Sequence, residues 1–131
     1  MHSPETPINH TRGGEKGRHR ELKLTIGALL TRAGYDILFE QKGCDVVGIK
    51  HRRDGTIFIL GVEAERSTRN VLRNIRRDLA SGIHKVLVVA ENKRLKRAIQ
   101  RKISKASESF GNRVAVTTLG IGSTTKKSGK T

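Results

Sequence analysis

Three acidic residues stand in or at the end of apolar runs that have the composition of β-strands. Glu63 and Glu65 end the run over residues 56–65, and Asp45 lies within the run over residues 44–49. If the two runs are neighbouring strands, the three carboxylates come close together, where burial and mutual repulsion make their charges costly. A cluster of this kind usually needs a divalent cation.

Hairpin geometry places these acids at one end of the sheet. The Asp-Gly pair at residues 54–55 is a strong turn signal between the two runs. Counting outward from that turn, Asp45 falls opposite the far end, where Glu63 and Glu65 lie. Because side chains two apart on a strand share a face, Glu63 and Glu65 point the same way, while Ala64 points opposite and offers its carbonyl nearby. We therefore expect one acidic cluster.

The donor types in this cluster predict a magnesium site. Mg²⁺ prefers oxygen ligands and keeps several waters, so we expect Asp45, Glu63 and the carbonyl of Ala64 to bind it, or Mn²⁺ in its place. Such an ion polarises a phosphoryl oxygen and lowers the pKa of an attacking water. Glu65 would then either help to hold the metal or orient and deprotonate that water.

The alternative interpretation of the two glutamates needs no metal. Glu63 and Glu65 would then form ordinary ion pairs at the end of a strand with Arg66, Arg69 or Lys42. Charged strand ends are common, and an exposed pair of this kind contributes little to stability. The sequence leaves both interpretations open.

Apolar periodicity predicts the elements that position the cluster. Stripes at helical spacing indicate helices, and short β-prone runs bounded by turn residues indicate strands. The expected helices span residues 16–33, 68–80 and 93–106, and the expected strands span residues 35–39, 45–49, 56–60, 85–90 and 113–117. The first three strands form a meander, and the strand–helix–strand units after them imply parallel pairing through right-handed crossovers.

These elements predict an α/β fold with a mixed central sheet flanked by helices. At 131 residues the chain is expected to hold one domain, over residues 15–119. The segments at residues 1–14 and 120–131 lack periodicity and are expected to be disordered tails, the second of them basic. The single cysteine, Cys44, excludes an internal disulfide and is most simply a small buried residue.

The charge of the chain points to a polyanionic partner. Lysine and arginine number 27 against 12 acidic residues, for a net charge of +15. We expect DNA, bound through its backbone phosphates, because aromatic residues are only 3% of the chain and offer no stacking platform. An RNA-binding or ribosome-associated basic protein is the weaker alternative. No long apolar segment or signal peptide is found, so a soluble cytoplasmic protein without membrane contact is expected.

The element order and the motif formed by Asp45 and Glu63-Ala-Glu65 resemble the PD-(D/E)XK nuclease superfamily, which includes restriction endonucleases and Holliday-junction resolvases. The resemblance covers residues 16–119 and implies a restriction-endonuclease-like αβββαβ core, followed here by a further helix and strand. It also implies Mg²⁺-dependent cleavage of duplex or branched DNA. Asp45 matches the first metal-binding aspartate of the family and Glu63 the second acid. Glu65 stands where most members have lysine. Some restriction endonucleases of the superfamily also carry a glutamate at this position.

The same superfamily often places a further glutamate on its first helix, within reach of the metal. Glu21 is the candidate here, although on a helical wheel it could equally be a solvated residue. His19 could assist at the same site, but a surface position is its simpler interpretation. The runs His19-Arg-Glu21 and Asn74-Ile-Arg-Arg-Asp78 also resemble plasmid and mobile-element members of this fold, whose nuclease activity is less established.

A row of basic residues follows the acidic cluster directly. Its members recur at spacings of three and four, which would place them along one side of the second helix. They are Arg66, Arg69, Arg73 and Arg76, and Lys42 is expected to join them in binding nucleic acid. The sequence thus favours a metal-dependent endonuclease that acts on DNA. The alternatives are a DNA-binding or assembly protein of the same fold without turnover, and a solvated basic face. A homodimer is expected if both DNA strands are cut.

Overall fold

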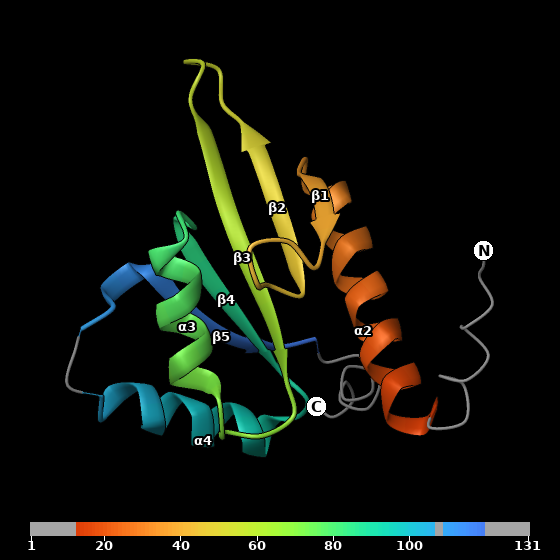
Figure 1. Cartoon of the computed structure of the whole chain (residues 1–131), viewed down its shortest axis with the longest axis vertical. Coiled ribbons are helices and arrows are strands. Elements are labelled where there is room, and N and C mark those ends of the chain that lie inside the picture. The colour runs from red at the N-terminus through yellow and green to blue at the C-terminus, as the bar shows by residue number, and fades with distance from the viewer. Residues whose placement is uncertain (1–12, 107–108, 120–131) are drawn as a thin grey trace, which may run out of the picture.

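The computed structural model describes residues 13–106 and 109–119, which form three α-helices, one short 3₁₀ helix and five strands (Figure 1). In chain order these elements are α2 (Gly13–Arg32), β1 (Asp36–Phe39), β2 (Val46–His51), β3 (Ile57–Glu65), α3 (Val71–Ala80), β4 (Lys85–Ala90), α4 (Lys93–Ser104), η1 (Gly111–Arg113) and β5 (Val114–Thr118). The expected tail at residues 120–131 lies outside the described residues. Residues 1–12 of the expected first tail also lie outside the described residues. The last two residues of that expected tail, 13 and 14, belong to α2.

All five strands belong to one mixed sheet in the order β1-β2-β3-β4-β5. The first three pair antiparallel, and β3, β4 and β5 pair parallel. The expected meander and the two parallel crossovers are therefore confirmed. Strand β3 lies at the centre, hydrogen-bonded to an antiparallel neighbour on one side and a parallel one on the other.

Helices cover both faces of the sheet, so the expected α/β architecture with a mixed sheet flanked by helices is confirmed. Helix α2 packs Ile26 against Val46, Val62 and Ala64 on one face. Helices α3 and α4 bury apolar side chains on the opposite face, beneath which the largest core cluster lies (Figure 1). The alternation of side chains along β3 therefore decides which helix each residue meets.

The turn between β2 and β3 projects beyond the helices (Figure 1). Gly55 adopts a positive φ of 89°, which favours glycine. The Asp54 carboxylate accepts hydrogen bonds from the backbone N–H and the hydroxyl of Thr56. These bonds lower the pKa of Asp54 below its ordinary value. The turn fixes the register in which Val46 pairs with Val62.

Helix α3 is shorter than its apolar stripe predicts. It begins at Val71 rather than at residue 68. The backbone N–H of Arg69 bonds the Ser67 hydroxyl, and that of Val71 bonds the Thr68 carbonyl, so the preceding residues form a turn of their own. The other expected elements are found with ends shifted by at most a few residues, apart from β3, which continues to Glu65.

No helix in the described ranges has both the length and the apolar character that crossing a membrane requires.

Candidate metal and nucleic-acid site

The carboxyl-terminal end of β3 holds two buried glutamates. Glu63 is 4% exposed and Glu65 is 8% exposed, and both contact side chains of α3. Ala64, between them, packs in the core cluster beneath α2. The prediction that the two glutamates share one face and Ala64 takes the other is thus confirmed.

Asp45 lies next to these glutamates, directly before β2. Its Oδ2 accepts a hydrogen bond of 2.8 Å from the backbone N–H of Ala64. The negative charge of Asp45 is close enough to help raise the pKa values of both Glu63 and Glu65. The structure therefore places the three predicted acids near one another at one end of the sheet, whereas the described residues whose ligand atoms lie within 4.8 Å of one another are Cys44, Glu63 and Asp78.

The carbonyl of Ala64 lies on the same side of β3 as Asp45. In an extended strand, the N–H and C=O of one residue point toward the same neighbouring strand. Since the Ala64 N–H donates to Asp45, the Ala64 carbonyl is also directed toward the side of β3 on which Asp45 lies. The backbone thus offers the oxygen that the sequence argument assigned to a metal ion.

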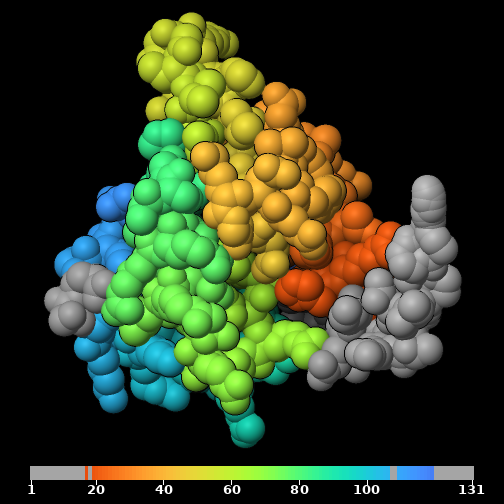
Figure 2. Space-filling view, in the orientation of Figure 1, coloured from red at the N-terminus to blue at the C-terminus, as the bar shows by residue number. Residues whose placement is uncertain are grey.

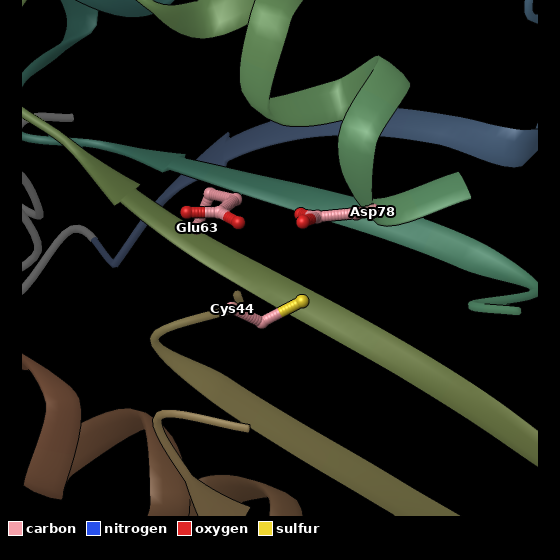
Figure 3. Close-up of side chains that lie close together, drawn as sticks. All are labelled: Cys44, Glu63 and Asp78. Carbon is pink, nitrogen blue, oxygen red and sulfur yellow. The ribbon is translucent and has the colours of Figure 1, made fainter. Parts of the chain in front are cut away.

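Glu63 has a cationic partner that the sequence argument did not name. Arg77 of α3 donates from one guanidinium nitrogen to Glu63 Oε2 at 3.1 Å, to Asp78 Oδ1 at 3.3 Å and to the carbonyl of Gly43 at 2.7 Å. The Arg77 side chain is 44% exposed, whereas Asp78 is completely buried. Figure 3 shows the carboxylates of Glu63 and Asp78 facing one another, with Cys44 beside them.

This environment makes Glu63 a very weak acid. Burial is the main cause, followed by a hydrogen bond with Asp78 and the charges of Asp78 and Asp45, and together they raise the pKa of Glu63 to about 10. Arg77 acts in the opposite direction but does not compensate. Burial beside Asp78 therefore favours the protonated form of Glu63, and a bound cation would take the place of that proton.

Glu65 is held by an amide rather than by a charge. Asn74 of α3 donates from its side-chain nitrogen to Glu65 Oε2 at 2.9 Å. Burial raises the pKa of Glu65 above its ordinary value, although the Asn74 hydrogen bond lowers it in part. A carboxylate with a raised pKa suits a general base that works near neutral pH.

The first helix reaches the cluster through a different residue from the expected one. Glu21 is exposed on α2. His19, two residues earlier, is partly buried and places its Nε2 3.3 Å from Asp45 Oδ1. His19 is thus partly exposed, as a surface residue would be, but it also contacts Asp45. The α2 stripe showed that one side of the helix faces the sheet but did not show which end meets Asp45.

The predicted basic row is exposed, but it is not one helical stripe. Its four arginines are all exposed, and α3 contains only the last two of them; they are Arg66, Arg69, Arg73 and Arg76. The turn before α3 explains this difference. In Figure 2, α3 and the segment that leads into it lie together on one surface of the molecule. Lys42 is exposed too, with its Nζ 3.4 Å from the carbonyl of Ser81.

Glu63 has an ion-pair partner that differs from the expected candidates Arg66, Arg69 and Lys42. The partner is Arg77, from the last turn of α3. The sequence contained one signal for it, because Asp78 falls on the buried side of α3 that bears Val71 and Ile75, and Arg77 directly precedes it. A charge at such a position is buried and needs a partner.

The oxygen donors at the end of β3 fit a hard dication. Asp45 and Glu63 supply carboxylates, and Ala64 supplies a carbonyl, which is the type of ligand that Mg²⁺ and Mn²⁺ prefer. To ligate an ion, Glu63 must release its proton and share or exchange its contact with Arg77. The exposure of Arg77 allows that side chain to move.

Comparisons of this chain with protein-family models, with curated proteins and with solved structures find no match.

Proposed function

We propose that this protein is a metal-dependent endonuclease with a restriction-endonuclease-like core, which hydrolyses phosphodiester bonds in duplex or branched DNA. The main support is the convergence of Asp45, Glu63 and Glu65 at the end of β3, directly before an exposed arginine-rich segment. Three acids in one partly buried place are costly without a cation. Phosphates are the anions that the neighbouring arginines would bind.

In this proposal, Asp45, Glu63 and the carbonyl of Ala64 hold one Mg²⁺ or Mn²⁺. The ion would supply charge stabilisation at the phosphoryl oxygen and a more acidic bound water. Glu65 orients that water and accepts its proton, since its carboxylate is already aligned by Asn74. His19 fixes the orientation of Asp45 from the side of α2.

Arg77 has a second role in the proposal. In the metal-free protein its guanidinium lies against Glu63 and Asp78. If an ion displaced the Glu63 proton and took over its carboxylate, the partly exposed Arg77 would become available to a DNA phosphate. An arginine can then stabilise the negative charge that develops during cleavage, which is the task of the lysine in most members of the superfamily.

The arginines after Glu65 bind the DNA backbone. Arg69 and Arg73 are exposed on the surface that includes α3. Each phosphate contact releases counterions, so binding should weaken steeply with salt. Replacing Arg73 with glutamine should reduce the slope of log affinity against log salt by about 1. Arg53→Gln, in the projecting turn between β2 and β3, is the matched control and should leave the slope unchanged.

Plasmid nicking tests the catalytic part. The purified protein, incubated with supercoiled plasmid and Mg²⁺ or Mn²⁺, should nick it. Asp45→Asn and Glu63→Gln should each abolish nicking while DNA binding persists. Asp36→Asn removes an exposed carboxylate near the other end of the β1–β2 pair and should nick as the wild type does. Nicking that survives Glu63→Gln would refute the assigned site.

A second candidate function is a DNA-binding or assembly protein that has the same fold but no turnover. The observation that favours it is that both glutamates already have protein partners, Arg77 for Glu63 and Asn74 for Glu65. Equal DNA binding by wild type and Glu63→Gln, with no cleavage by either, would establish this function. Tighter binding to structured RNA than to duplex DNA at the same salt would instead favour an RNA partner.

A further inference from the structure

A second cluster of potential ligands lies beside the acidic site, on the side of α3. Cys44 Sγ and one carboxylate oxygen each from Glu63 and Asp78 lie within 4.8 Å of one another. All three residues are buried, with exposed fractions of 2%, 4% and 0%. They come from the loop before β2, from β3 and from α3, and their side chains converge in Figure 3.

One carboxylate oxygen of Asp78 points to a ligand in this cluster. Its Oδ1 accepts from Arg77, but no N–H or hydroxyl donor reaches its Oδ2 within the part of the chain that the structure describes, although the side chain is completely buried. A proton shared with the facing Glu63 carboxyl group, or a cation in its place, would satisfy that oxygen. Buried carboxylate oxygens are nearly always hydrogen-bonded or bound to an ion. The Asp78 carboxylate faces Glu63 in Figure 3, so its oxygens are directed into the cluster.

The packing around Cys44 brings its thiol to the same place. Gly61 of β3 has no side chain, and a Cβ there would lie only 2.7 Å from Cys44 Sγ. The loop before Cys44 turns through positive φ angles at Lys42 and Gly43, and the Cys44 N–H bonds the carbonyl of Gln41. The thiol therefore sits above the sheet, next to Glu63, rather than at the surface.

We propose that Cys44, Glu63 and Asp78 form a binding site for a transition-metal dication, for which Zn²⁺ is the natural probe. A thiolate and two carboxylates are a mixed sulfur and oxygen set, which Zn²⁺ accepts and Mg²⁺ does not. Three protein ligands leave a fourth, open position on a tetrahedral ion. This site differs from the proposed magnesium site in its ligands, because it uses Cys44 and Asp78 in place of Asp45 and Ala64.

Charge balance supports a dication in this position. The thiolate and the two carboxylates would bring three negative charges, which the two charges of the ion and the one of Arg77 neutralise. Near neutrality is what a buried site requires, because an unbalanced buried charge is expensive. Arg77 contacts one oxygen of Glu63 and one of Asp78, so it can hold both carboxylates from outside the ion.

The spacing of the ligand atoms requires only a small contraction. Bond lengths of about 2.3 Å to sulfur and 2.0–2.2 Å to oxygen place the donors of a tetrahedral zinc site roughly 3.5 Å apart. The ligand atoms of Cys44, Glu63 and Asp78 now lie within 4.8 Å of one another. Rotation about the side-chain bonds of Glu63 and Asp78 can bring them closer.

Cobalt(II) gives a readout that does not depend on nuclease activity. Cys44 is the chain's only cysteine, so any near-ultraviolet band from thiolate-to-cobalt charge transfer must come from it. We expect the full-length protein, in buffer without added thiol, to develop this band with one equivalent of Co²⁺ and to lose it when Zn²⁺ is added. Cys44→Ser and Cys44→Ala should both lack the band while keeping the circular-dichroism spectrum of the wild type.

Two substitutions separate this site from the proposed magnesium site. Asp78→Asn should weaken Co²⁺ binding by more than about tenfold, because it removes a charged ligand. Asp45→Asn should keep the band, and it should keep it even if the wild-type protein nicks no DNA. The absence of a band in folded wild-type protein would overturn the proposal, and so would a band of unchanged affinity in Asp78→Asn, which would mean that the thiol binds cobalt alone.

Discussion

Replacing Glu63 with glutamine should stabilise the metal-free protein at neutral pH, even though it should abolish the proposed nuclease activity. The physical reason is the proton that Glu63 retains. In the folded protein its pKa is about 10, whereas in the unfolded chain it returns to its ordinary value of 4.5. Folding therefore takes up a proton at every pH between these two values.

The sign and size of the effect follow from this proton uptake. Because the folded pKa is raised, the favourable contribution is fully present below pH 4.5 and is lost as the pH rises toward 10. The loss is about 1.4 kcal/mol per pH unit, so at pH 7 it amounts to roughly 3 kcal/mol. This loss of stability at pH 7 requires only that the pKa of Glu63 in the folded protein lies well above 7. Glutamine is neutral in both states and keeps an acceptor for Arg77, so it avoids the loss.

Urea denaturation in the presence of a chelator, at pH 5, 7 and 9, measures the effect. The free energy of unfolding of Glu63→Gln should exceed that of the wild type by an amount that grows from about 1 kcal/mol at pH 5 to roughly 3 kcal/mol at pH 7. Asp36→Asn, which changes an exposed carboxylate, is the control and should follow the wild type. A difference that does not change with pH would mean that Glu63 is ionised in the fold and paired with Arg77, and the reasoning would be wrong.

Three other substitutions test the packing and hydrogen bonds around the site. Gly61→Ala would push a Cβ to 2.7 Å from Cys44 Sγ, so it should lower the free energy of unfolding by about 1–3 kcal/mol in chemical denaturation. Asn74→Ala removes the donor to Glu65, which should cost about 1–3 kcal/mol. It should also move the rising limb of the pH profile of nicking to higher pH, because the lost bond lowers the pKa of Glu65. Asn92→Ala removes the side-chain cap at the start of α4 and should cost about 1 kcal/mol by thermal denaturation, without affecting DNA binding.

Local patterns were enough to predict most of the fold. Strand β4 matches its expected range because a continuous apolar run is bounded by polar residues on both sides. The positions of Glu63 and Glu65 on one face followed from strand alternation alone. The start of α3 was misplaced because Ser67 and Thr68 cap a turn that precedes the helix, and a stripe of apolar residues does not distinguish the two.

The partners of the acids depend on packing that no local pattern determines. Arg77 and Asp78 contact Glu63 only because α3 lies across β3 with its last turns over the cluster. His19 meets Asp45 because of how α2 is rotated and shifted along the sheet. Helical periodicity gives the side of a helix that is buried but not the residues of another element that it meets.

The central position of β3 has a consequence for the order in which the molecule opens. A strand bonded to neighbours on both sides exposes its amides only when much of the sheet comes apart, so they should exchange hydrogen with solvent at rates set by global unfolding. Leu60, Gly61 and Val62, which pair with both β2 and β4, should therefore belong to the slowest-exchanging part of the described chain. Fraying of β1 or β5 at the margins should leave their geometry intact.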